Sequence, residues 1–182
     1  IADNHNKAKY LIHILNKNKR KYSINYSFRY TKWFADTYKY IHNNHNKGEI
    51  DLTWKFKGRH LKKKEASWKT NHSLGGGVIK YYGIHLIAIL SDIGYSDINK
   101  SNISNQANFE LTSWSSEFVS NKKLPKLNLL IDSYSNENIF CWQQINHTLL
   151  EIESPFSLES SEYKGDNRIP PTIKFLKEKN ND

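Results

Sequence analysis

Two carboxylates on one predicted strand and a third near the next strand form the first pattern that could support chemistry. Glu49 and Asp51 alternate along the first strand, and Glu65 follows a basic turn. Some metal-dependent nucleases hold a metal with carboxylates in this order and stabilise charge on the phosphate with a lysine in a Glu-x-Lys motif. The residues after Glu65 do not complete that motif. A metal-dependent nuclease using Glu49, Asp51 and Glu65 is therefore the alternative hypothesis.

Basic residues interleaved with rings form the second pattern. Lysine and arginine neutralise phosphates, and tryptophan, tyrosine and histidine can stack on bases. The preferred hypothesis is therefore RNA binding without catalysis, with no catalytic residue, metal ligand or cofactor. The predicted RNA contacts lie on one turn and one helix: Lys57, Arg59, His60, Lys62, Lys63, Lys64 and Lys69 on the turn, and Arg29, Lys32 and Lys39 on the helix.

The charge distribution supports a polyanionic partner. Residues 1–80 hold 18 Lys/Arg and 5 Asp/Glu, whereas residues 81–182 hold 9 and 13. The first part of the chain therefore carries a net +13 and the rest a net −4, within a total of +9. Such a split favours contact between the basic part and a polyanion. No apolar run long enough for a membrane span is apparent, so no membrane partner is predicted.

Three other features indicate structure rather than chemistry. Gly75-Gly76-Gly77 lacks both the P-loop Lys-Ser/Thr and the spaced glycines of a dinucleotide fingerprint, so it is interpreted as a flexible joint. His42 and His45 have no carboxylate or cysteine at a matching spacing. Cys141 is the only cysteine, which excludes an internal disulfide and a Cys-based zinc site.

The elements that must position these residues follow from periodicity. Apolar residues at helical spacing predict helices over 7–20 and about 27–43. Strict alternation predicts a half-buried strand over 49–57. Gly58 permits a turn, and a returning strand from Ala66 would complete a hairpin with a basic tip.

The remaining chain is less regular. Residues 78–93 are apolar and ambiguous, and their isoleucine and valine content favours a strand. Weaker alternation predicts further strands near 109–113 and 127–131. The predicted class is α+β, with N-terminal helices, a basic-tipped hairpin and a mainly antiparallel sheet. The predicted domains are a helical segment 1–22, an RNA-binding domain 23–119, and a divergent extension and docked tail 120–182.

The order of several short motifs resembles the C-terminal domain of small-subunit ribosomal protein S-three, in its divergent mitochondrial form. Ser27-Phe28-Arg29 opens a helix, Lys47-Gly48 precedes a strand, Lys57-Gly58-Arg59 stands for Ser-Gly-Arg, and Leu90 to Tyr95 resembles a later strand. The resemblance covers about residues 23–115. The family's glycine pair, closing strand and upstream KH domain are not recognisable.

This resemblance implies a non-catalytic constituent of the small ribosomal subunit. The implied partners are ribosomal RNA, neighbouring small-subunit proteins and a separate chain carrying the missing KH domain. Lysine outnumbers arginine, and methionine is absent from a chain that begins at Ile1. These features fit an organelle product, so a ribosome in the mitochondrial matrix is the expected location.

Overall fold

Most helical elements precede most strands along the described chain, and the strands build one sheet with helices against it. The computed structural model describes residues 5–24, 27–30, 32–43, 48–63, 67–105, 110–144 and 147–151 of the 182-residue chain. The helical elements are α1 (His5–Lys17), η1 (Ser27–Tyr30), α2 (Lys32–Asn43), α3 (Arg59–Lys63), η2 (Trp68–Thr70), η3 (His72–Leu74), η4 (Val78–Gly83) and α4 (Ile84–Ile93). The strands are β1 (Glu49–Lys57), β2 (Asp97–Ser104), β3 (Ser113–Val119), β4 (Lys126–Asp132), β5 (Tyr134–Gln144) and β6 (His147–Glu151).

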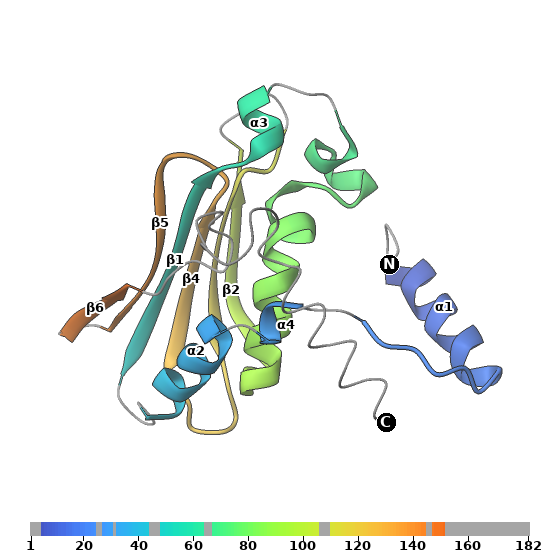
Figure 1. Cartoon of the computed structure of the whole chain (residues 1–182), viewed down its shortest axis with the longest axis horizontal. Coiled ribbons are helices and arrows are strands. Elements are labelled where there is room, and N and C mark those ends of the chain that lie inside the picture. Colours follow the sequence, from blue (N-terminus) through green and yellow to red (C-terminus); the bar gives the residue numbers. More distant parts are fainter. Residues whose placement is uncertain are drawn as a thin grey trace.

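The sheet has six strands in the order β2-β3-β4-β1-β5-β6. Among the described pairings only β1 with β4 is parallel, and the other four are antiparallel. Helices α2 and α4 lie on the same face of this sheet (Figure 1). Because β1 and β4 run in the same direction, both strands end at one edge of the sheet, where α3 follows β1.

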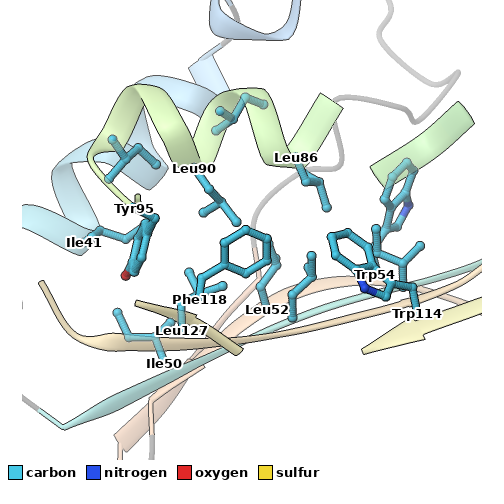
Figure 2. Close-up of a cluster of buried hydrophobic side chains, with 14 of the residues drawn as sticks. Ile41, Ile50, Leu52, Trp54, Leu86, Leu90, Tyr95, Trp114, Phe118 and Leu127 are labelled. Atoms are coloured by element: carbon cyan, nitrogen blue, oxygen red, sulfur yellow. The ribbon is translucent and has the colours of Figure 1, made fainter. Parts of the chain in front are cut away.

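The core lies between this face and helix α4. Strand β1 alternates as its sequence predicts, with Ile50, Leu52 and Trp54 buried. These side chains point toward α4, whose Leu86 and Leu90 point back at the sheet (Figure 2). Burying a side chain of this size contributes about 1.5–3 kcal/mol, so this contact supplies much of the stability.

The coarse α+β prediction is confirmed, and several local predictions hold with it. A helix occupies most of 7–20, two helical elements occupy most of 27–43, and a strand occupies 49–57. Strand β4 covers the 127–131 alternation, whereas β3 begins only at Ser113, the last residue of the 109–113 alternation. The described sheet is mainly antiparallel, as expected.

The predicted hairpin is wrong. Strand β1 is followed by helix α3, and its sheet neighbours are β4 and β5, which lie far along the chain. The stretch 78–93 is also not a strand: it forms the π-helical η4 and then α4. Gly94, at φ +121°, ends that helix. A helix that is packed in the core lacks the polar face that identifies an amphipathic helix. The apolar run alone therefore did not distinguish this helix from a buried strand.

The stretch His72–Ile93 is also the only candidate membrane span among the described residues, by length and composition alone. It includes Gly75 to Gly77, and Leu86, Ile89 and Leu90 within it are buried in the core. Packing against the sheet therefore accounts for the apolar character of these three core residues.

The domain boundaries predicted near residues 22 and 119 stay a prediction. Two facts bear on the segments that they separate. Helix α1 has no buried residue and lies away from the sheet (Figure 1). Strand β4, from the segment predicted as an extension, lies between β3 and β1.

Candidate functional site

A junction of strand ends gathers polar and aromatic residues at one edge of the sheet. The Gly58 N–H, directly after β1, donates to the Ser133 carbonyl after β4 at 2.8 Å. The Ser133 N–H donates in turn to the Thr112 carbonyl before β3 at 2.9 Å. The Val78 N–H at the start of η4 donates to the Leu111 carbonyl at 2.9 Å. These bonds bring four segments together that are far apart in sequence.

A buried histidine–glutamate pair lies at this junction. His60, on α3, is 6% exposed, and the side chain of Glu110 is 7% exposed. The His60 Nε2 lies 3.0 Å from the Glu110 Oε1. When the Glu110 carboxylate is ionised it only accepts hydrogen bonds, and Nε2 then carries the hydrogen and donates it to Glu110. Taking such a pair out of water is costly, which makes the pairing a requirement of the fold.

Tyr82 extends this pair into a chain of three groups. Its hydroxyl lies 3.4 Å from the His60 Nδ1, and the two rings are stacked at 15°. With hydrogen on Nε2, the Nδ1 accepts from the tyrosine hydroxyl. Burial raises the pKa of Tyr82, and neighbouring Tyr81 and Glu110 raise it further, so the hydroxyl stays protonated at neutral pH. The chain is thus Tyr82 to His60 to Glu110.

Gly58 leaves room for this arrangement. A Cβ at that position would lie 2.9 Å from the Tyr82 hydroxyl and 3.2 Å from the His60 Cε1. Any larger residue would push at least one of the two rings away. The glycine is therefore required by a close approach of side chains rather than by a hairpin turn.

Next to the chain, Tyr81 stands among aromatic and basic groups. Its ring meets Trp68 edge-on, with centroids 5.5 Å apart and planes at 89°. The Lys69 Nζ lies 5.3 Å from the centroid of the same ring. The ring also lies 6.3 Å from that of His60. Residues of the basic turn and of the apolar stretch thus share one surface.

The triple glycine holds this surface in place, and the prediction of a flexible joint is wrong. Gly76 and Gly77 are buried. A Cβ on Gly76 would lie 2.3 Å from the Trp68 carbonyl oxygen, which is closer than any packed structure allows. Gly75 and Gly77 have φ of +92° and +80°, in the region that glycine favours.

His72 lies beneath this turn. The pKa of His72 is lowered, mainly by burial and further by the neighbouring Lys80. Its Nδ1 is buried without a hydrogen-bond partner.

Among the ten residues predicted to bind RNA, those that the structure describes lie in different environments. His60 is buried, Lys62 is exposed, and Lys69 lies over Tyr81. Lys57 lies 5.0 Å from the Tyr134 ring and donates to Asn136 at 3.2 Å. Arg29 forms an ion pair with Asp92 at 2.7 Å, and Lys39 is exposed on α2. The backbones of Lys32, Arg59 and Lys63 are helical, and Lys64 lies outside the described residues.

The predicted nuclease carboxylates do not form a metal site. Glu49 and Asp51 lie on the sheet face opposite the core, where the Asn128 Nδ2 donates to both, at 3.1 and 2.8 Å. Glu49 is also paired with Lys126. Glu65 lies outside the described residues, and within the described part of the chain no group of three potential ligands gathers.

Sequence reasoning missed Glu110, Tyr81 and Tyr82. Glu110 is separated from His60 by 50 positions, and only the sheet brings the two together. The one local signal was Tyr81-Tyr82 beside Gly83, an aromatic pair within an apolar run.

Neither known protein families nor curated protein sequences match the chain. Solved structures share its fold. The WlbA (WbpB) dehydrogenase from Thermus thermophilus, solved with NAD and alpha-ketoglutarate, aligns at 14% identity and a TM-score of 0.58, over 93% of this chain and 53% of that one. D-galactose-1-dehydrogenase from Rhizobium etli aligns at 14% identity and a TM-score of 0.62, over 77% and 45%. An NAD-binding protein from Listeria innocua aligns at 10% and 0.59, over 74% and 39%.

These likenesses identify the fold as one found in dehydrogenases. The chain spans about half or less of the length of each of these structures. The identification with ribosomal protein S-three is therefore wrong, as is the ribosomal function inferred from it. The same likeness contradicts the prediction that the chain is no enzyme.

The predicted partners are also contradicted, namely ribosomal RNA, small-subunit proteins and a KH-bearing chain. The nuclease alternative has no support either. Short motifs in the expected order misled the sequence interpretation, because a helix followed by Lys-Gly and a strand is compatible with more than one fold. The mitochondrial location, and the contacts assigned to the ten basic residues, stay predictions.

Proposed function

We propose that this chain is the substrate-side part of a nicotinamide-dependent oxidoreductase. The observation that carries the proposal is the fold: dehydrogenases and oxidoreductases share it over 73–93% of this chain. Those proteins are longer, and the chain spans 53% of the WlbA dehydrogenase and 45% of the galactose dehydrogenase. Because fold alone does not fix function, the site must supply the second argument.

The described residues do not fit a dinucleotide. Such a cofactor needs a glycine-rich turn whose free backbone N–H groups face a phosphate at a helix N-terminus. Here the Gly76 N–H already donates to the Asn71 carbonyl at 2.9 Å, and the Gly75 N–H to the His72 carbonyl at 3.3 Å. The Trp68 carbonyl fills the space beside Gly76. The cofactor would therefore be held by another part of the enzyme.

The residues of this chain suit the proton-transfer part of such a reaction. Oxidising a hydroxyl, or reducing a carbonyl, moves a proton at the substrate oxygen. His60 can hold this proton on Nδ1, and the Glu110 carboxylate, 3.0 Å from Nε2, stabilises the resulting imidazolium. The Tyr82 hydroxyl, 3.4 Å from Nδ1, links His60 to the surface that Tyr81 shares. The arrangement is a positioned base oriented by a buried carboxylate.

The test is an assay of nicotinamide-dependent turnover by the longest natural form of the protein. A panel of hydroxylated and carbonyl compounds is screened by the absorbance of the reduced nicotinamide. We expect turnover of at least one compound, and His60→Gln to lower kcat by about 10²–10⁴-fold, the usual contribution of a general acid–base group.

Exposed Lys122→Gln is the matched control and should leave kcat unchanged, because Lys122 lies outside the junction. Circular dichroism of the His60→Gln variant separates a loss of chemistry from a loss of folding. Turnover of no compound, in a protein that also fails to bind any nicotinamide nucleotide, would reject the proposed function.

A further inference from the structure

We infer that Trp68, Lys69 and Tyr81 form a binding surface for a ring that carries an anionic group, such as a sugar phosphate, a sugar acid or a nucleotide. This ring–anion surface lies beside the Tyr82–His60–Glu110 chain. The inference rests on the proposed function, because it names the class of substrate that this site would receive.

The first observation is the exposed indole. Trp68 is 51% exposed, whereas Trp54 is 4% exposed and Trp114 is 2% exposed. The indole is nevertheless held in place, because Tyr81 packs against it edge-on. A fixed aromatic face open to solvent suits a ligand ring, and stacking of a base on such a face is worth about 1–3 kcal/mol.

The backbone under the indole is also fixed. The Ser67 Oγ accepts a hydrogen bond from the Lys69 N–H at 3.2 Å, and the Thr70 hydroxyl donates to the Ser67 carbonyl at 2.8 Å. The Trp68 carbonyl packs on Gly76. These contacts mean that a ligand would not have to order this turn when it binds.

The second observation is the charge. Lys69 lies over the Tyr81 ring, Lys62 is exposed on α3, and the Lys80 Nζ donates to the His72 carbonyl at 2.9 Å. No acidic residue occurs in 58–63 or 67–91. The neighbouring carboxylate, Glu110, is buried and already paired with His60. Among the described residues of these segments, positive charge therefore predominates, which favours an anion.

The third observation places the ring–anion surface beside the proton-holding groups. The Tyr81 and Tyr82 rings are 4.7 Å apart, and Tyr81 is 6.3 Å from His60. A single tyrosine therefore borders both the exposed indole and the buried histidine. The stacking face and the proton chain can serve one ligand.

The test measures binding of glucose 6-phosphate, adenosine monophosphate, glucose and inorganic phosphate by calorimetry. We expect each ring that carries a phosphate to bind at least about tenfold more tightly than glucose or phosphate alone, because stacking and charge add. Trp68→Leu should weaken ring-phosphate binding about tenfold. Lys69→Gln should weaken it up to about fivefold and flatten its salt dependence.

Tyr38→Leu and Lys39→Gln are the matched controls, since both side chains are exposed and adjacent on α2. They should leave all four affinities unchanged, and unchanged circular dichroism confirms that every variant is folded. Ring-phosphate binding no tighter than phosphate binding would overturn the inference. So would a Trp68→Leu variant that binds the ring phosphates as the parent chain does.

Failure of this inference is distinguishable from failure of the proposed function. Nicotinamide-dependent turnover of an uncharged substrate, unaffected by Trp68→Leu, would keep the function and reject the ring–anion surface. Ring-phosphate binding that depends on Trp68, without any turnover, would keep the ring–anion surface and reject the function.

Discussion

The two faces of the sheet differ in the kind of side chain that they carry. On β1, Ile50, Leu52 and Trp54 lie on the face covered by α4 and are at most 4% exposed. Glu49 and Asp51 alternate with them on the open face, where they are half-buried. The same backbone thus carries an apolar layer on one side and an ionic network on the other.

The open face is organised around Lys126. This lysine pairs with Glu49 and, at 3.3 Å, with Glu117, and Asn99 donates to Glu117 at 2.7 Å. The side chain of Lys126 is 34% exposed, so water screens these pairs. Apolar burial therefore holds the sheet, whereas the open-face charges make its stability depend on pH.

The largest expected effect on stability comes from removing a large apolar side chain from the covered face. Trp54→Ala removes a ring packed against Phe56 at 4.5 Å and Phe140 at 6.0 Å. The cavity should lower the free energy of unfolding by about 3–5 kcal/mol. Thr53→Ala, on the opposite face of the same strand, is the control, with an expected loss of about 1 kcal/mol or less. Urea denaturation measures both, and equal losses would contradict the contrast between the faces.

Disrupting the buried His60–Glu110 pair should also lower the stability of the protein, as a change on the covered face does. Glu110→Gln keeps an acceptor for the His60 Nε2 but removes the charge. The free energy of unfolding should fall by about 1–3 kcal/mol, the range for a weakened buried hydrogen bond. Glu137→Gln, at the exposed ion pair with Lys55, should change stability much less. A double-mutant cycle of Glu110→Gln with His60→Gln should show strong coupling. Additive losses would mean that the pair does not act as a unit.

Removing an ion pair from the open face should have a smaller effect on stability. Lys126→Ala removes the partner of both Glu49 and Glu117, and we expect a loss well below that of Glu110→Gln. Added salt should shrink the difference between the variant and the parent chain, because screening weakens exposed pairs. A loss as large as that of Trp54→Ala, or one that grew with salt, would mean that the network carries the sheet.

The smallest effect is a pH dependence that sharpens the comparison. Hydrogen bonds from Lys126 and then Asn128 lower the pKa of Glu49 below its ordinary value of 4.5. The unfolded chain therefore binds this proton at a higher pH than the folded chain does. The stabilisation from Glu49 is present above pH 4.5 and is lost as pH falls through the folded-state pKa. The melting temperatures of the Lys126→Ala and parent chains should converge as pH falls over this range. A difference in melting temperature that widened toward acid pH would contradict the prediction.

Local patterns predicted local elements well. The alternation of Ile50, Leu52 and Trp54 predicted β1 and its covered face. Apolar spacing predicted most of α1 and α2. The site was predicted far less well, since His60 was expected at an exposed tip and is 6% exposed. Its partner Glu110 comes from another part of the chain, and no local pattern indicates a contact of that kind.

The sequence by itself determined several local elements, namely most of α1 and α2 and the strands β1 and β4, and which face of β1 is apolar. These properties depend on the spacing of side chains along a few turns or pleats. Only the tertiary structure decided that β1 lies between β4 and β5, that the 78–93 stretch is helical, and that Gly76 packs beneath the Trp68 carbonyl. The reason is physical: strand pairing and side-chain burial depend on which distant segments meet, and a sheet can bring residues 60 and 110 together without any signal between them.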